Sequence, residues 1–374
     1  MGKICIFCGE QPESKTLEHV LPQWLIELTG NPKRRARFGY KKLGEGKFAE
    51  RSFAFDAFKF PSCKACNQKF ADLEAIAKVI VHKMMSEDCL SESELSRLLD
   101  WFDKVRIGLW LGYLYLNRNP LGISPSFHVQ HRISQHDRML AIFKTGGNMK
   151  GLTFIGCETP AFAQTPSCFS LRINNLWFLN MSLPNLLARR MGFPFPRESY
   201  TMDDGRLCCY FGKGLSRIMR PVLKKPISIK GTELYQPVFS GNLAGAPNVN
   251  WKKLYDTKYV RDNCISWEKG IGRVYIKKDS EVVAYNTLPS MEWLPERTHN
   301  LDELCFEMQS LTLEWQLHII KNLVLPSVKF LSRERKRQMV SLVDLGKYYN
   351  RAMLEHLTKV REGIDFGVNE EGYS

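Results

Sequence analysis

Hydrophobic side chains recur at helical spacing in two consecutive segments of the N-terminal third of the chain. The first segment begins after Cys66, in the sequence CNQKFADLE, and its hydrophobic positions are Phe70, Leu73, Ile76, Ala77 and Ile80. The second segment follows Ser91 and Glu94, whose spacing matches a Ser-x-x-Glu capping box at a helix start. Its hydrophobic positions are Leu95, Leu98, Leu99, Phe102, Val105, Leu109, Trp110 and Tyr113. The periodicity predicts two helices whose hydrophobic faces pack in a core.

Other patterns predict strands and a C-terminal helical region. Phe53, Phe55 and Phe58 alternate with other residues ahead of Cys63, which is typical of a strand. Residues 152–240 also have a strand-like pattern, most clearly in LTFIGC and FSLRINNLWFLNMSL, and the pattern becomes helical from Asp302 to about Arg361. We therefore expect an α+β protein, in which a small N-terminal domain precedes a larger mixed helical and β region with a helical C-terminus.

The length of 374 residues favours two or three domains. We expect an N-terminal domain at residues 1–88, a middle domain with a helix and β-structure at 89–245, and a C-terminal region at 246–374 that is mixed and then helical and basic. The final sequence, EGIDFGVNEEGYS, is expected to be disordered.

The chain has no pattern typical of a membrane or secreted protein. Its longest strongly hydrophobic run, Ile107 to Leu116, has about ten residues, whereas a helix needs roughly 18 to cross a bilayer. The N-terminal sequence MGKICIFCGE lacks the long hydrophobic segment and cleavage site of a secretory signal. We therefore expect a cytoplasmic protein with no membrane partner.

The formal net charge of +14 favours polyanionic partners, nucleic acid first and an anionic membrane surface second. Positive charge is concentrated in two places. The first cluster is Lys33, Arg34, Arg35, Arg37, Lys41 and Lys42, and the second is the sequence RERKR from Arg333 to Arg337. Either cluster alone is equally consistent with a solvated face or a flexible loop. Together with the net charge, the two clusters favour nucleic acid.

Four of the 11 cysteines form two Cys-x-x-Cys pairs, Cys5 with Cys8 and Cys63 with Cys66. Two intervening residues allow a tight turn that brings both sulfurs to one metal ion, so the pairs predict a closed, structural zinc site. A redox-active pair is less consistent with the sequence, because no thioredoxin-like βαβ pattern surrounds it. The other seven cysteines have no ligand spacing and are interpreted as buried residues or free thiols: Cys89, Cys157, Cys168, Cys208, Cys209, Cys264 and Cys305.

The segment between the cysteine pairs contains Glu18 and His19, and Asn67 follows directly after the last cysteine. The expected order is a cysteine knuckle, a strand with Glu18 and His19, a basic loop, a second strand, a second knuckle and a helix. This arrangement over residues 5–74 resembles the HNH endonucleases, also called ββα-metal nucleases, in the subgroup framed by two zinc knuckles. The segment from CNQKFADLE through LLDWFDKVRIGLWLG also resembles the region that follows the nuclease motif in stand-alone bacterial HNH proteins, several of which belong to phage-defence systems.

The resemblance implies a role for each of these residues. His19 corresponds to the general base, Glu18 to an acidic metal ligand and Asn67 to a second ligand of a catalytic Mg²⁺ or Mn²⁺ ion. Glu74 lies two helical turns after Asn67, so it is either a further ligand or partner of the site or, more simply, a surface glutamate. In the same interpretation the Lys33–Lys42 cluster contacts phosphates beside the cleavage site.

Two departures from the family pattern leave alternatives open. The family usually has Asp where this chain has Glu18, and its middle Asn has no clear counterpart, because Asn31 is the only Asn between His19 and Cys63. The expected function is a metal-dependent endonuclease acting on DNA. The alternatives are a non-catalytic zinc-ribbon module that binds nucleic acid or protein, and an HNH nuclease that cleaves RNA.

The remainder of the chain is expected to control the nuclease. An unrestrained nuclease would damage its host, so we expect gating by the C-terminal region, a protein partner or an activating ligand. His128, His131 and His136 lie close together in the sequence, but no acidic residues at ligand spacing accompany them. We interpret these histidines as surface or core residues and not as a metal site.

Overall fold

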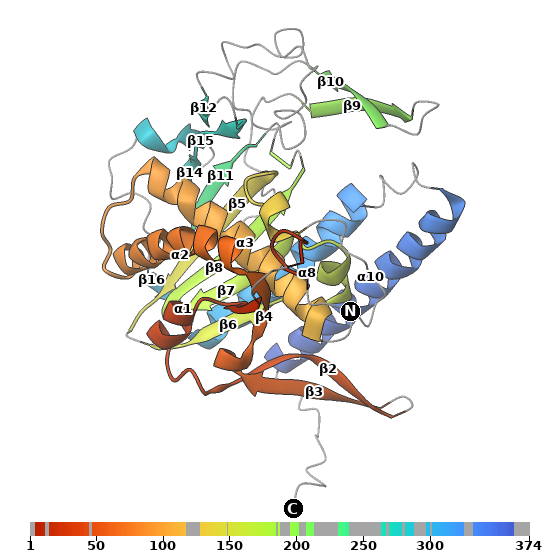
Figure 1. Cartoon of the computed structure of the whole chain (residues 1–374), viewed down its shortest axis with the longest axis horizontal. Coiled ribbons are helices and arrows are strands. Elements are labelled where there is room, and N and C mark those ends of the chain that lie inside the picture. The colour runs from red at the N-terminus through yellow and green to blue at the C-terminus, as the bar shows by residue number, and fades with distance from the viewer. Residues whose placement is uncertain are drawn as a thin grey trace, which may run out of the picture.

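The computed structural model describes most of the chain. Its described residues are 4–11, 15–44, 47–116, 128–147, 149–184, 186–187, 195–201, 207–212, 231–238, 263–266, 269–278, 281–287, 297–299, 301–324 and 332–362. Within them the protein combines helices and strands and has a long helix near its C-terminus, which confirms that part of the predicted fold class (Figure 1). The tail predicted to be disordered is residues 362–374; Glu362 is the C-cap of the last helix, and residues 363–374 lie outside the described residues.

The N-terminal part is built on two paired strands and a helix. Strand β1 (Lys15–His19) pairs antiparallel with β4 (Lys59–Cys63), so that Lys15 lies opposite Cys63 and His19 lies opposite Lys59. Helix α2 (Lys64–Met85) follows β4 directly, with Cys63 as its N-cap. We call residues 4–85 the N-terminal module.

Between β1 and β4 the chain forms helix α1 (Gln23–Leu28) and a hairpin of β2 (Arg35–Gly44) and β3 (Lys47–Ala54). The prediction of a basic loop was therefore wrong from residue 35 onwards, because the basic segment is strand β2. Pairing with β3 satisfies backbone groups that an extended loop would leave to water. The strand expected in the Phe53–Phe58 pattern is present only to Ala54, and a short 3-10 turn (Phe55–Ala57) follows it.

Both predicted helices are present. Helix α2 buries most of the expected face, including Phe70, Leu73 and Ile80, whereas Ile76 of the same face is exposed. Helix α3 (Glu92–Leu116) begins with the predicted capping box, in which the Glu94 backbone N–H donates to Ser91 Oγ at 3.2 Å and the Ser91 N–H donates to Glu94 Oε2 at 2.8 Å. These reciprocal bonds satisfy backbone donors that a helix start leaves unpaired.

A large sheet occupies the middle of the molecule. Its strands are β5 (Asp137–Thr145), β6 (Leu152–Ile155), β7 (Cys168–Ile173), β8 (Leu176–Leu183), β11 (Thr232–Gln236), β14 (Tyr275–Lys278), β15 (Glu281–Ala284) and β16 (Arg297–His299). The order is β15-β14-β11-β5-β8-β7-β6, and these neighbours pair antiparallel. Strand β16 lies off this path and pairs parallel with β5. The strands expected in LTFIGC and FSLRINNLWFLNMSL are β6, β7 and β8, whereas β5 was not predicted.

Smaller elements complete the described structure. Strands β9 (Phe195–Thr201) and β10 (Leu207–Gly212) form one antiparallel pair, and β12 (Cys264–Ser266) and β13 (Ile271–Gly272) form another. The C-terminal helices are α8 (Leu301–Ile319), which continues into a π-helical turn (Ile320–Val324), and α10 (Arg333–Arg361). A short helix, α4 (Pro160–Gln164), packs against α10.

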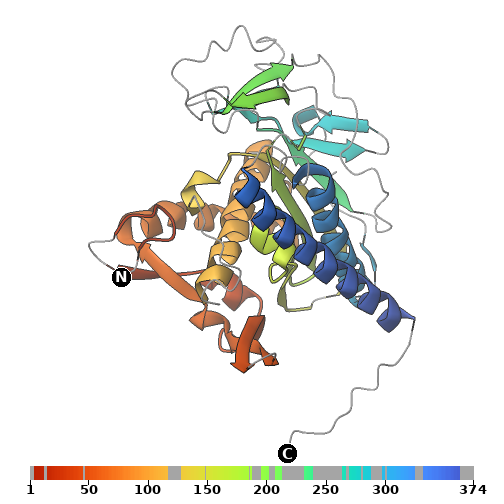
Figure 2. The same ribbon diagram turned by 90° about the vertical axis from the view of Figure 1, so that its right-hand side faces the viewer.

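Helices cover both faces of the large sheet. Alternate side chains along a strand point to opposite faces; Leu140 and Ile142 join the core shared with α3 and the N-terminal module, whereas Ala141 and Phe143 join the core shared with α8. Figure 2 shows the N-terminal module on one side of the sheet and α8 and α10 on the other. The central strands are therefore buried on both faces, and strand β8 is buried over its whole length, including its polar residues Asn180 and Ser182.

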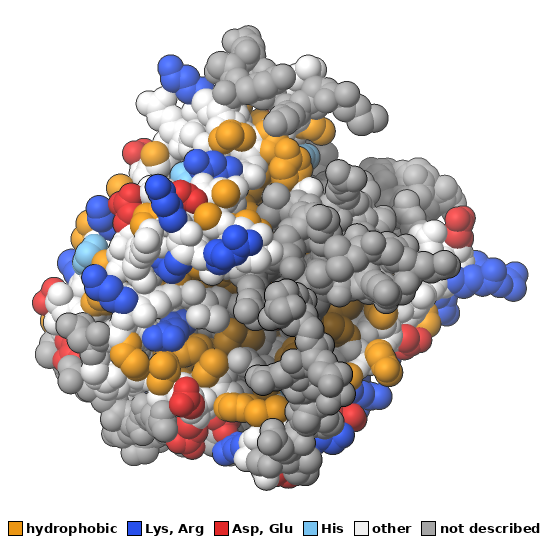
Figure 3. Space-filling model, turned by 90° about the horizontal axis from the view of Figure 1, so that it is seen from below, with side chains coloured by type: hydrophobic (Ala, Val, Ile, Leu, Met, Phe, Trp, Pro, Cys, Tyr) orange, Lys and Arg blue, Asp and Glu red, His pale blue; other side chains and the backbone are white. Residues whose placement is uncertain are grey.

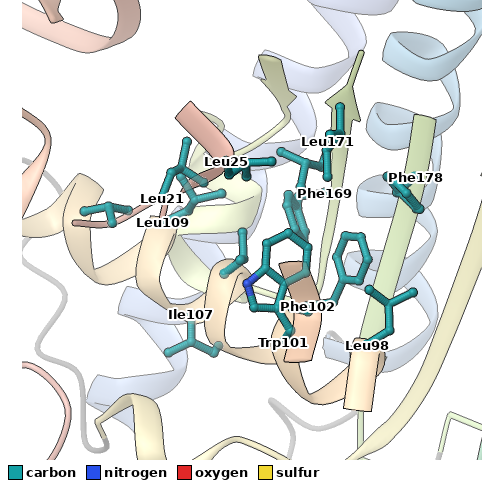
Figure 4. Close-up of a cluster of buried hydrophobic side chains, with 14 of the residues drawn as sticks. Leu21, Leu25, Leu98, Trp101, Phe102, Ile107, Leu109, Phe169, Leu171 and Phe178 are labelled. Atoms are coloured by element: carbon teal, nitrogen blue, oxygen red, sulfur yellow. The ribbon is translucent and has the colours of Figure 1, made fainter. Parts of the chain in front are cut away.

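The core on the α3 side joins the N-terminal module to the sheet. Figure 4 shows Trp101 and Phe102 of α3 among Leu25 of α1 and Phe169 and Phe178 of the sheet. The Phe102 ring lies 5.1 Å from the Phe178 ring and 5.1 Å from the Trp101 ring, measured between centroids. Full burial of each such side chain contributes roughly 1.5–3 kcal/mol, so this shared core links residues on both sides of the predicted boundary at residue 88.

Two glycines let α3 approach the N-terminal module closely. A Cβ atom on Gly112 would lie 3.0 Å from Val20 Cγ2 and 3.2 Å from the Phe58 ring, which is tighter than ordinary packing. A Cβ atom on Gly108, one turn earlier, would lie 3.7 Å from the Val20 carbonyl oxygen and 4.0 Å from the Phe60 ring, which is ordinary contact. The two positions therefore differ in whether they tolerate a side chain.

We predict that Gly112→Val lowers the free energy of unfolding by about 1–3 kcal/mol, because its branched side chain overpacks the contact with Val20 and Phe58. Gly108→Ala is the matched control. It is expected to be neutral or to stabilise the protein by up to about 1 kcal/mol, because alanine fits there and favours the helix. Denaturant unfolding of both variants checks this, and equal effects at the two positions would contradict the packing described here.

Candidate metal centre and acid-histidine site

The two cysteine pairs come together at one end of the β1–β4 ladder. One sulfur from each of Cys5, Cys8, Cys63 and Cys66 lies within 4.8 Å of every other. Cys8 Sγ and Cys63 Sγ are 4.0 Å apart, close to the roughly 3.8 Å between sulfurs that are each about 2.3 Å from one tetrahedral zinc ion. The four thiols could therefore hold a metal ion such as zinc, as the sequence predicts.

Backbone contacts hold the four sulfurs in this arrangement. The Cys63 N–H donates to Cys5 Sγ at 3.3 Å, and the Cys66 N–H donates to Cys63 Sγ at 3.4 Å. The first knuckle is attached to β4, because the Ile6 N–H donates to the Pro61 carbonyl oxygen at 3.0 Å. Gly9 closes that knuckle with a φ of +83°, a conformation that side chains strongly disfavour.

The surroundings of the thiols shift their pKa values in different directions. Burial raises the pKa of the Cys66 and Cys8 thiols above their ordinary value. The Cys66 backbone N–H is the main cause that lowers the pKa of Cys63. The positive charge of a bound zinc ion would balance the negative charges of the buried thiolates. Zinc binding would therefore release the thiol protons. The donor set and the sulfur-directed N–H groups both fit zinc.

Glu18 and His19 are adjacent on β1 and therefore point to opposite faces of the strand. Glu18 is only 9% exposed, and its carboxylate points to α3, where the Lys104 ammonium donates to Glu18 Oε1 at 3.0 Å. The same ammonium also donates to Glu74 Oε1 of α2. Lys104 is 4% exposed, so one buried lysine joins the carboxylates of two different elements.

His19 lies among different neighbours. Burial first, and then the charge of Lys59, lowers the pKa of His19 below its ordinary value. A hydrogen bond with the Asp56 backbone and the charges of Glu18 and Asp56 act in the opposite direction. Its Nε2 atom is shielded and has no hydrogen-bond partner among the described residues. The ring is therefore held as a neutral imidazole at neutral pH.

Asn67 lies in the first turn of α2, close to the cysteines. It is half-buried, and it is separated from Glu74 by seven residues, which corresponds to about 10 Å along a helix. The structure thus brings Glu74 to Glu18 through Lys104, and the described contacts do not bring Asn67 to either residue.

The expected Mg²⁺ or Mn²⁺ ligands are not assembled around one point. Within the described part of the chain, the four cysteines are the only group of three or more His, Cys, Asp or Glu side chains placed to share a metal ion. Glu18 and Glu74 converge, but an ammonium lies between them. The residues present therefore do not fit a divalent ion in this arrangement.

The basic cluster divides into side chains with different surroundings. Arg34 is directed inward, because its guanidinium donates to the Ile26 carbonyl at 3.1 Å and lies 4.6 Å from the centre of the Phe55 ring. Lys33 and Arg35 are exposed, and Arg35 Nε donates to Ser52 Oγ at 2.8 Å. The side chains of Arg37, Lys41 and Lys42 lie outside the described atoms, although their backbone belongs to β2. Figure 3 shows Lys and Arg side chains spread over the described part of one face, with Asp and Glu among them.

The three clustered histidines do not gather into a shared metal site within the described residues. His128 packs on the knuckle glycine Gly9, and its ring centre lies 6.2 Å from that of His131. His136 is mostly shielded, and its Nε2 has no hydrogen-bond partner among the described residues. Burial, followed by the charges of Arg132 and Arg106, lowers the pKa of His136 to about 3.

Three residues of the site were not found from the sequence. Lys104 lies in the middle of a predicted core helix, where a lone lysine gives no functional signal. Lys59 lies opposite His19 because β1 pairs with β4, and Asp56 belongs to the 3-10 turn that precedes β4.

Comparison with known proteins gave no match: no protein-family model matches the chain, and no significantly similar curated protein or solved structure was found. Across the described residues, no helix combines the length and the hydrophobicity needed to cross a bilayer.

We predict that the purified protein contains about one zinc ion per chain, and that Cys66→Ser loses this ion together with stability, because a structural zinc site contributes directly to folding. Elemental analysis and thermal unfolding measure both effects. Cys89→Ser is the matched control, because Cys89 is exposed and lies outside the cluster. A zinc content that is unchanged in Cys66→Ser would contradict this assignment.

We predict that His136 makes stability depend on acid pH. Its pKa of about 3 in the folded chain is below the ordinary value near 6.5, so the unfolded chain binds the extra proton first. The contribution is complete above about pH 6.5 and is lost as the pH falls towards about 3, at up to about 1.4 kcal/mol per pH unit. His136→Gln should flatten the unfolding free energy against pH in that window. The same substitution at exposed His82 should leave the slope unchanged.

Proposed function

We propose that this protein is an endonuclease that hydrolyses phosphodiester bonds of DNA, with His19 as the general base. The observation that carries the proposal is the order and pairing of β1, β4 and α2. One strand presents His19, and its partner leads through the cysteine cluster into a helix. The same order of strand, strand and helix, framed by two cysteine knuckles, is the pattern for which the sequence resembles the HNH nucleases.

The lowered pKa of His19 suits a role as proton acceptor, which also requires that water reach its Nε2 atom, shielded in this structure. Its lowered pKa keeps the imidazole neutral at pH 7, and a neutral imidazole accepts a proton from a water molecule that attacks phosphorus. As the water oxygen bonds to phosphorus, the bond to the 3′ oxygen breaks, and that oxygen takes up a proton from a second water molecule. Lys59, opposite His19 on β4, supplies a positive charge beside the place where the phosphate would bind.

The expected cofactors of this proposal are a structural Zn²⁺ ion at the four cysteines and a catalytic Mg²⁺ or Mn²⁺ ion. The proton transfer described here does not depend on the second ion, whose expected ligands are not assembled. DNA is the expected partner because exposed positive side chains, among them Lys33 and Arg35, suit contact with phosphates. A role in antiviral defence and a gating partner belong to the same proposal.

One observation favours a second candidate, a zinc-framed module that binds nucleic acid or protein without cleaving it. Glu18 is buried in an ion pair with Lys104, and Asn67 lies about two helical turns from Glu74. A module that had lost catalysis would retain the cysteine cluster and the packing while its acidic residues formed internal contacts of this kind.

We predict that the full chain nicks or linearises supercoiled plasmid in the presence of Mg²⁺ or Mn²⁺, and that His19→Ala reduces the rate at least about 100-fold, because a general base contributes roughly 10²–10⁴. Gel electrophoresis of the plasmid over time measures the rate, and a parallel assay with single-stranded RNA tests the alternative substrate.

The matched control is His82→Ala, which removes an exposed histidine of α2 and is expected to cleave like the unchanged protein. Equal cleavage by the His19 and His82 variants would overturn the assignment of His19. Binding of DNA without cleavage by any variant would favour the non-catalytic module.

A further inference from the structure

We propose that Lys104 is the resident cation of the Glu18–Glu74 carboxylate pair and competes there with a divalent metal ion. The inference rests on the proposed function only for the role of that ion, because the cation contacts themselves belong to the described structure. Lys104 lies on α3, outside residues 5–74 that carry the nuclease motif, and nothing in its sequence neighbourhood marks it as part of a site.

The geometry of the three side chains carries the first step. Lys104 Nζ is 3.0 Å from Glu18 Oε1 and also contacts Glu74 Oε1, so the ammonium lies between the two carboxylates. A metal ion that bridges two carboxylates needs the same place, about 2.0–2.6 Å from an oxygen of each. The ammonium and a bridging ion therefore exclude one another.

The charges of the three groups favour exchange. Two carboxylates and one ammonium leave a surplus of one negative charge in a place where all three side chains are at most 16% exposed. A divalent ion would neutralise both carboxylates, whereas the ammonium neutralises one. Buried carboxylates need such compensation, because removal of a charge from water is costly.

The position of Lys104 is fixed by its neighbours. Its ammonium lies 5.6 Å from the centre of the Phe7 ring and 5.8 Å from that of Phe70. Phe7 is part of the first cysteine knuckle, and Phe70 is on α2. The lysine therefore contacts the knuckle, the helix and, through Glu18, the strand that carries His19. While Lys104 is in this position, its ammonium pairs with the Glu18 carboxylate. A metal ion can therefore enter only if the Lys104 side chain leaves.

The test is the affinity of the full-length, zinc-loaded protein for Mn²⁺, measured by titration calorimetry and by the paramagnetic signal of free Mn²⁺. Lys104→Met removes the charge and keeps an unbranched side chain that is one atom shorter. We expect it to bind Mn²⁺ at least tenfold more tightly than the unchanged protein. The double variant Lys104→Met with Glu18→Gln should lose that gain, because one of the two carboxylates is gone.

Two further variants separate charge from packing. Lys104→Arg keeps the positive charge, so it is expected to bind Mn²⁺ no more tightly than the unchanged protein. Lys83→Met removes a lysine of α2 that pairs with Glu94 at 2.6 Å near the surface, so it should leave Mn²⁺ affinity unchanged. The melting temperature of Lys104→Met should rise with Mn²⁺ more than that of the unchanged protein.

Four outcomes would overturn the proposal: no gain in affinity in Lys104→Met, a gain that survives Glu18→Gln, a gain in Lys104→Arg, or a Lys104→Met chain that stays unfolded in saturating Mn²⁺. The result is independent of cleavage. A tighter Mn²⁺ site in a protein that cuts no DNA would leave this proposal standing, while the predicted plasmid cleavage would have failed. Cleavage that depends on His19, without a change in Mn²⁺ affinity, would do the reverse.

Discussion

The buried ion network between α3 and β5 determines how the layers of this protein fit together. Arg138, at the start of β5, is fully buried, and its guanidinium contacts Asp100 and Asp103 of α3. Asp103 also accepts from Arg106 at 2.7 Å. Charges as deeply buried as these are stable only when they are paired, and loss of one partner typically costs about 3–5 kcal/mol. The network therefore specifies one position of the helix on the sheet, which hydrophobic contacts alone would leave less well defined.

The candidate site depends on that position because α3 has a second polar surface. Lys104 follows Asp103 directly but points away from the sheet, towards Glu18 and Glu74 of the N-terminal module. Gly112 allows the same helix to pack closely on Val20, the residue after His19. The strand with the acid-histidine pair is thus positioned by an interior helix that is itself fixed to the sheet.

Local sequence patterns predicted the local structure well. The helical faces of α2 and α3, the capping box of Ser91 and Glu94, strands β6 to β8 and the four-cysteine cluster all follow from residues close together in the sequence or from a specific ligand spacing. The basic segment was predicted to be a loop because its charged residues obscure the sequence pattern of a strand. Its partner strand, β3, also contains charged residues.

The contacts of the site could not be predicted in the same way. The pattern of α3 showed a hydrophobic stripe, but it did not show that Asp100, Asp103 and Lys104 are also buried, because charged residues are normally exposed unless paired. The partners of Lys104 lie 86 residues away in Glu18 and 30 residues away in Glu74. Which residue of α2 approaches Glu18 depends on the direction of the helix along the ladder, and that direction brings Glu74 there instead of Asn67.

The cysteine cluster also determines where the length of this chain can change. It joins residues that are separated by 54 positions between Cys8 and Cys63, and the β2–β3 hairpin belongs to the loop that the cluster closes. The entropy of closing a flexible loop grows slowly, by about 0.6 kcal/mol for each doubling of its length. The hairpin forms its own sheet, apart from the β1–β4 ladder. Insertions or deletions in the hairpin therefore change the length of its basic strand, while the β1–β4 ladder and the four sulfurs keep their positions. The hairpin is thus the part of the module in which a new binding specificity can arise with the smallest loss of folding stability.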